Sequence, residues 1–163
     1  GIDSESGVER IPLGTSYGDL KVFTDTAIDA AFMVEPGVSA GEAAGLFKVI
    51  ARVGDYFPRY QWGIILASNR WLVERRDLID RLMGAFRKAC RFIHTHPEDT
   101  LELGGDIFKV DQAVFRRALL RDLSHWQIDA RIDDAGLRHA LNIQAGMGVA
   151  IDPINMTQMV EQM

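Results

Sequence analysis

Four side chains have the types and positions expected of a small-molecule binding site. Glu35 stands before Pro36 at the end of an apolar run, where its carboxylate could accept hydrogen bonds from an amine or a ring N–H. Trp62 could stack on a planar ligand. Ser16 and Tyr17 stand where a predicted strand meets a predicted helix, and the free N–H groups of a helix N-terminus suit an anion. We therefore predict that these four residues bind a ligand.

Each of these residues also has an ordinary structural interpretation. Glu35 could be a surface carboxylate that begins a turn, and Trp62 could pack in the core. Ser16 could simply cap a helix. Asp29, in the same apolar run as Glu35, is more often a structural residue than a ligand. The residue types alone leave both interpretations open.

The sequence predicts no catalytic residue, no metal site and no cofactor. Ser39, Ser68 and Ser124 lack the Gly-x-Ser-x-Gly setting of an acyl-transfer nucleophile. His94 and His96 are two positions apart, which places them on different faces of a helix. A zinc site would also need further ligands beside this pair.

The composition is that of an ordinary globular chain, with 163 residues, 47% hydrophobic and 25% charged. The net charge of -5 and the absence of a basic run argue against nucleic-acid binding. The single cysteine, Cys90, excludes an internal disulfide. No apolar run approaches the roughly 18 residues of a membrane span. The chain begins without Met and without a secretory signal, so we expect a processed or truncated product.

The first part of the chain alternates predicted strands and helices. Apolar runs predict strands at residues 8–13, 28–34, 47–53 and 60–67. Helical spacing predicts helices at residues 17–27 and 39–46. This alternation predicts a parallel sheet and an α/β fold. Glu35 would then lie beyond the carboxyl end of a strand, where open sheets of this kind bind ligands.

The second part of the chain is predicted to be helical. Residues 78–93 place apolar side chains at i, i+3 and i+4 over about four turns. Pro97 suits the first position of the next helix. Helix caps are predicted at Ser68, Asp111, Asp133 and Asp152.

Several phrases in this order resemble one family of solute-binding proteins of ABC-type importers, the nitrate/sulfonate/taurine and thiamine-pyrimidine-precursor family. Residues 27–36, AIDAAFMVEP, resemble its G-x-I-D-A-A-x-x-x-E-P strand. Residues 63–68, GIILAS, followed by RWL at 70–72, resemble the strand that returns the chain to the first lobe. The helix that closes with FIHTHPE at 92–98 is similar to the family's helix ending W-I-x-x-N-P-E. Residues 154–160 resemble its closing helix.

The resemblance implies a periplasmic-binding-protein type II-like fold. Residues 1–60 would be a second-lobe α/β segment, and residues 61–163 would return to the first lobe and be mostly helical. The N-terminal half would complete the cleft. The protein would bind a sulfonate, a nitrate or a pyrimidine precursor and deliver it to an ABC permease. Its location would be periplasmic or extracytoplasmic, and it would not be an enzyme.

Two alternatives stay open. One is an enzyme of the pyrimidine-synthase-like branch of the same fold, although those enzymes carry a cysteine-rich iron motif and this chain has only Cys90. The other is a ligand-sensing domain of a regulator. In each case an uncovered lobe interface would expose apolar surface, so we also predict that the isolated chain associates with itself.

Overall fold

The computed structural model divides the chain into two compact units, which we describe separately. It describes residues 6–12, 20–25 and 28–149. The first unit comprises Gly1–Val49 and Leu101–Asp122, and the second comprises Ile50–Thr100 and Leu123–Met163.

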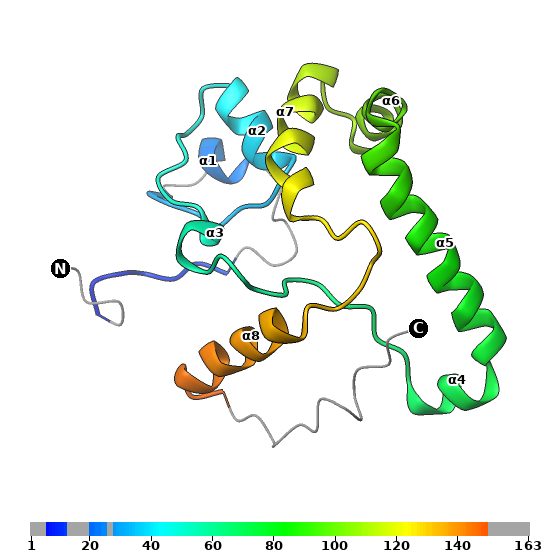
Figure 1. Ribbon diagram of the computed structural model, residues 1–163. Coiled ribbons are helices and arrows are strands. Elements are labelled where there is room, and N and C mark those ends of the chain that lie inside the picture. Colours follow the sequence, from blue (N-terminus) through cyan, green and yellow to red (C-terminus); the bar gives the residue numbers. More distant parts are fainter. Residues whose placement is uncertain (1–5, 13–19, 26–27, 150–163) are drawn as a thin grey trace. The chain divides into compact units, whose positions relative to one another are not determined.

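Helices and connecting coil make up the described part of both units (Figure 1). The first unit contains α1 (Val22–Asp25), α2 (Gly37–Ala43), α7 (Gln112–Asp122) and most of α6 (Pro97–Phe108). The second unit contains α3 (Val53–Tyr56), α4 (Asn69–Glu74), α5 (Arg76–Thr95), the 3₁₀ turn η1 (Leu123–His125) and α8 (Asp134–Gly146). The described helices include none whose length and hydropathy would let it span a bilayer.

The core of the first unit lies where α2 packs against α7 (Figure 1). The buried face of α7 carries Phe115, Ala118 and Leu119, at the i, i+3, i+4 spacing of an apolar helix stripe. The buried residues of α2 are small, and they include Gly41 and Ser39. A Cβ at Gly41 would collide with the ring of Phe47. Small residues on α2 therefore permit the close packing of this unit.

Gly104 in α6 has the same role against the ring of Phe115. An added Cβ would collide with this ring, which is only 8% exposed and has little room to move. We expect Gly104→Ala to lower the free energy of unfolding by about 1–3 kcal/mol, the usual cost of overpacking. Chemical denaturation followed by circular dichroism measures this loss.

The neighbouring Gly105 provides the matched control. Its added Cβ would come no closer than 3.6 Å to the carbonyl oxygen of Val110, an ordinary contact. Gly105→Ala should therefore be neutral, or stabilising by up to about 1 kcal/mol through helix propensity. A Gly104→Ala protein as stable as the Gly105→Ala protein would show that the ring of Phe115 does not occupy this position.

The structure confirms the predicted long helix and the predicted starts of several other helices. α5 covers the predicted residues 78–93 and packs against α4 near its beginning, where Ile79 is buried. The Ser68 hydroxyl caps α4 by accepting the N–H of Trp71 at 3.3 Å. α6 begins at Pro97, as predicted. The Asp111 carboxylate accepts the N–H of Ala113 at 2.8 Å and so caps α7 of the first unit.

The sheet of the predicted α/β fold is not confirmed. No strand is present at residues 6–12, 20–25 or 28–149. Where the structure describes them, the segments predicted as strands are coil, apart from Val53, which begins α3. A strand needs a neighbouring strand to pair its backbone N–H and C=O groups. The apolar runs at these segments also predicted that their side chains are buried. Ile50 is nevertheless 88% exposed and Leu66 is 79% exposed. Of the predicted α/β fold, the helices within the described residues are thus confirmed. The assignment of residues 1–60 and 61–163 to two lobes stays a prediction.

Two helices also differ from their predicted bounds. The helix predicted at residues 39–46 begins two positions earlier, at Gly37, directly after Pro36. Of the helix predicted at residues 17–27, the structure describes residues 20–25, of which Val22–Asp25 are helical. The helix predicted after Asp152 lies outside the described residues.

Candidate functional site

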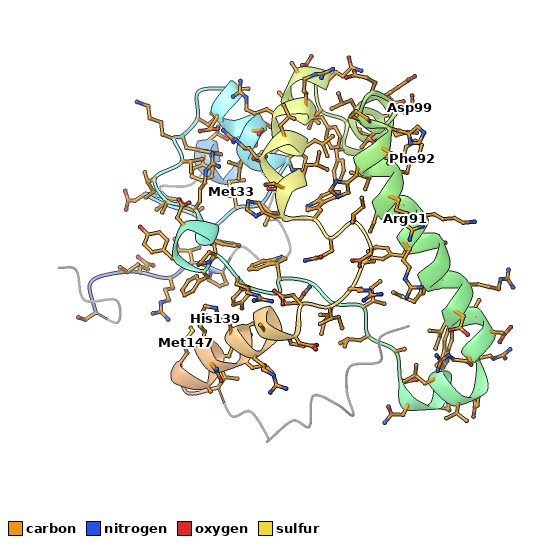
Figure 2. The ribbon with its side chains drawn as sticks, viewed as in Figure 1. Met33, Arg91, Phe92, Asp99, His139 and Met147 are labelled. Carbon is orange, nitrogen blue, oxygen red and sulfur yellow. The ribbon has the colours of Figure 1, made fainter. Side chains whose placement is uncertain are left out.

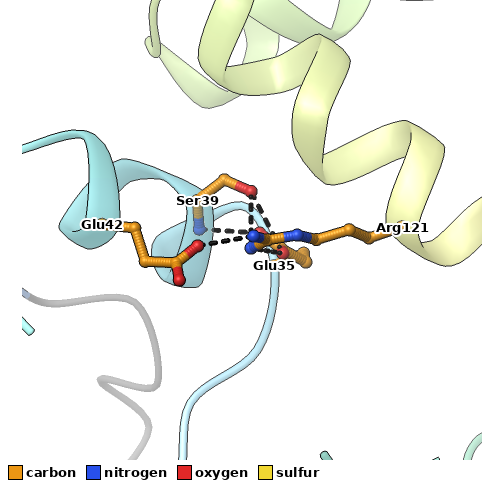
Figure 3. Close-up of polar contacts among 4 residues, drawn as sticks. All are labelled: Glu35, Ser39, Glu42 and Arg121. Atoms are coloured by element: carbon orange, nitrogen blue, oxygen red, sulfur yellow. Dashed lines mark hydrogen bonds and ion pairs between the residues drawn. The ribbon is translucent and has the colours of Figure 1, made fainter. Parts of the chain in front are cut away.

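Glu35 lies at the start of α2, joined to Pro36 by a cis peptide bond. Its carboxylate accepts three hydrogen bonds (Figure 3). The backbone N–H of Ser39 donates at 2.9 Å and the Ser39 hydroxyl at 3.1 Å. The guanidinium of Arg121, on α7, donates from Nη1 at 3.1 Å. Both carboxylate oxygens of Glu35 therefore have partners within the first unit.

Arg121 joins this carboxylate to a second one. Its Nη2 donates to Glu42 at 2.5 Å, and its Nη1 lies 3.3 Å from the hydroxyl of the fully buried Ser39. The hydrogen bond from Arg121 lowers the pKa of Glu42, against the opposing effect of burial. We call Glu35, Ser39, Glu42 and Arg121 the arginine cluster (Figure 3). It ties α2 to α7 by charge as well as by packing.

The geometry favours the structural interpretation of Glu35. Its side chain is 11% exposed, and a ligand would have to displace Arg121 or Ser39 to reach the carboxylate. No local sequence pattern points to Arg121 or Glu42 as partners of Glu35. Arg121 is 86 positions from Glu35, and no local pattern pairs residues at that separation.

Trp62, in the second unit, has a different setting. Its side chain is 67% exposed, and its ring centroid lies 6.2 Å from that of Tyr60. Tyr60 lies 6.3 Å from Phe57, and Phe57 meets the ring of His139 edge-on, also at 6.3 Å. We call residues 57–62 the aromatic segment. It presents an accessible indole beside further rings, which is the arrangement that a planar ligand needs for stacking.

Polar contacts with Asp133 and with α8 hold side chains and one backbone carbonyl of the aromatic segment. Arg59 donates two hydrogen bonds to the carboxylate of Asp133, from Nε at 2.8 Å and from Nη2 at 2.7 Å. The backbone N–H of Asp133 donates to the side-chain oxygen of Gln61 at 3.0 Å. His139, on α8 (Figure 2), places Nδ1 at 2.9 Å from the carbonyl oxygen of Arg59. Asp133 was predicted to cap α8 with its side chain, but its carboxylate is taken by Arg59 instead.

The Arg59 guanidinium also determines the acid range over which this contact persists. Its hydrogen bonds are the largest cause of a lowered pKa of Asp133, from 3.8 to about 2, with smaller contributions from the backbone N–H groups of Gly136 and Ala135 and against the opposing effect of burial. Because the pKa is depressed by folding, the stabilisation is complete above about pH 3.8 and is lost as the pH falls through about 2. We expect an NMR titration of the Asp133 carboxyl carbon to give a midpoint near 2, and Arg59→Met to return it toward 3.8. A midpoint near 3.8 in the unsubstituted protein would show that the ion pair does not form in solution.

The other residues considered as ligand contacts are Ser16, Tyr17 and Asp29. Ser16 and Tyr17 lie outside the described residues. Asp29 is exposed on coil. Glu35 belongs to the first compact unit and Trp62 to the second, and the contacts described for each lie within its own unit.

Cys90 and His94 lie on α5, and His96 follows its last residue; in the described part of the chain no three potential metal ligands gather. The ring of His96 stacks on Phe92 at 4.6 Å. The Nε2 of His94 is buried without a hydrogen-bond partner among the described residues. Burial, with a smaller effect from Asp129, raises the pKa of the Cys90 thiol and so favours its neutral, unreactive form.

An open hollow of about 430 Å³ lies beside the end of α6. Its lining mixes acidic, basic and apolar side chains: Leu101, Glu102, Gly105, Asp106, Lys109, Val110 and Gln112. It is shallow, whereas ligand sites usually enclose most of the ligand surface. The aromatic segment is therefore the stronger candidate. Comparison with known proteins finds no match to a family model, to a characterised protein or to a solved structure.

Proposed function

We propose that this chain is part of a solute-binding protein that binds a small molecule for ABC-type import in the periplasm or another extracytoplasmic space. The supporting sequence features are AIDAAFMVEP at 27–36, GIILAS at 63–68 and FIHTHPE at 92–98, in this order. The ligand class is a sulfonate, a nitrate or a pyrimidine precursor. In this proposal the fold is periplasmic-binding-protein type II-like, and the remaining half of the cleft comes from an N-terminal half.

The observation that carries the proposal is the exposed indole of Trp62 on an anchored backbone. An aromatic side chain that is 67% exposed gives up little packing when it binds a ligand. Because Arg59 and Gln61 are already held by Asp133, ordering this backbone costs little further conformational entropy on binding. An accessible aromatic ring favours a ligand that itself contains an aromatic ring, and among the proposed classes this favours the pyrimidine type.

Exposed apolar side chains on α5 support the proposal that another protein surface binds to this helix. Leu78, Leu82 and Phe86 are 41%, 56% and 44% exposed and recur at i, i+4 and i+8, along one face of the helix. In the proposal, the N-terminal half of the protein or the ABC permease covers such surface. When neither is present, self-association of the isolated chain would cover it instead.

A thermal-shift comparison on the full-length protein tests the proposal. The probes are taurine, nitrate and 4-aminopyrimidine, each at rising concentration. A bound probe present at about 100 times its Kd should stabilise the folded protein by about 2.7 kcal/mol. That stabilisation should raise the melting temperature by several degrees, and 4-aminopyrimidine should give the largest rise. Melting curves unchanged by every probe at millimolar concentration would contradict the proposal.

A further inference from the structure

Three residues connect α8 to the aromatic segment without being part of its exposed ring surface. Asp133 stands just before α8, and Gly136 and His139 follow on it. Asp133 holds the guanidinium of Arg59 and the side chain of Gln61. A Cβ at Gly136 would lie 3.2 Å from the backbone nitrogen of Gln61, so the segment passes close to the first turn of α8. These contacts fall on both sides of Tyr60 and end directly before Trp62.

The contact of His139 has a defined direction. Nδ1 lies 2.9 Å from the carbonyl oxygen of Arg59, and a carbonyl oxygen can only accept a hydrogen bond. Nδ1 therefore carries the proton. The contact persists in the neutral tautomer protonated at Nδ1 and in the charged ring, because both donate from this nitrogen. The edge-on ring of Phe57 adds an apolar contact to the same imidazole.

We propose that His139 is a positioning residue, which fixes the backbone that carries Trp62 and so determines how tightly this indole stacks on its ligand. The ligand-binding part of this inference rests on the proposed function. The positioning part stands on the contacts within the second unit. Asp133 shares this role through Arg59, and the donor at Nδ1 is the property of His139 on which the role depends.

Two substitutions separate the hydrogen bond from the ring contact. His139→Asn retains a side-chain N–H donor near the position of Nδ1 and removes the ring. His139→Phe retains a ring against Phe57 and removes the donor. Since His, Asn and Phe have similar helix propensities, α8 itself should be affected equally.

Fluorine NMR of protein labelled with 5-fluorotryptophan gives the readout. The Trp62 resonance is assigned by its loss in Trp62→Phe. We expect His139→Phe to move this resonance toward the position of free 5-fluorotryptophan and His139→Asn to leave it near its original position. If His139→Phe fails to fold by circular dichroism, His139→Leu, which likewise lacks the donor, takes its place. An unchanged Trp62 resonance in the folded donor-free variants would overturn the positioning role.

A binding titration with 4-aminopyrimidine distinguishes this inference from the proposed function. If the probe binds, loss of one neutral hydrogen bond should weaken its affinity about three- to tenfold in His139→Phe and less in His139→Asn. Equal affinities in both variants and in the unsubstituted protein would contradict the effect of positioning on binding. If the unsubstituted protein binds none of 4-aminopyrimidine, taurine and nitrate, the proposed function fails. The fluorine spectra still decide whether His139 positions Trp62.

Discussion

Replacing Arg121 with Met should lower the free energy of unfolding by about 2–3 kcal/mol, because it removes charge-assisted hydrogen bonds from two carboxylates that are largely shielded from water. The side chains of Glu35 and Glu42 are 11% and 22% exposed, so water cannot fully replace the lost guanidinium. Met retains the apolar stem of the side chain, which limits the change to the charge. Denaturant unfolding measures the global loss, and amide hydrogen exchange in α2 measures the local one.

Arg117 provides the control on the same helix. It is exposed on α7, and none of the hydrogen bonds of the arginine cluster involves it. Arg117→Met should change the free energy of unfolding by no more than about 0.5 kcal/mol, as is usual for a surface substitution. Equal losses in the two variants would mean that α2 and α7 are held together by packing alone.

Trp62→Ala should weaken the binding of 4-aminopyrimidine roughly five- to thirtyfold, which corresponds to about 1–2 kcal/mol of lost stacking and burial. The melting temperature should change little, since the indole is 67% exposed and supports little packing in the described structure. Titration calorimetry beside thermal melting separates the two effects.

Trp71→Ala is the matched control for this prediction. Trp71 is 44% exposed on α4 and lies outside the aromatic segment. Its removal should leave the affinity for 4-aminopyrimidine unchanged. The stacking model would be wrong if both substitutions weakened binding equally, or if Trp62→Ala left the affinity unchanged while lowering the melting temperature.

Local patterns in the sequence predict the helices well. Periodic apolar residues identify α5, Pro97 identifies the start of α6, and the side chains of Ser68 and Asp111 form the predicted caps. Each of these signals acts within a few residues along the chain. The strands were not confirmed because an apolar run such as residues 28–34 predicts burial but contains no information about a pairing partner.

The candidate sites were predictable only in part, for the same reason. Trp62 was selected for its residue type, and the structure places it on the surface beside Tyr60. The partner of Glu35 is Arg121, which is 86 positions away, and the partner of Arg59 is Asp133, which is 74 positions away. Such pairs depend on tertiary packing, so a local reading assigned Glu35 to a ligand and the Asp133 carboxylate to a helix cap.

The proposed stacking site is tested most directly by whether the indole of Trp62 touches the ligand. At a saturating concentration of 4-aminopyrimidine, we predict intermolecular nuclear Overhauser effects between the Trp62 indole and the pyrimidine ring protons. The ring current of the indole should also shift those protons upfield. Overhauser effects that involve only other parts of the protein, or no binding of the probe at all, would contradict the proposed binding of a ligand at Trp62.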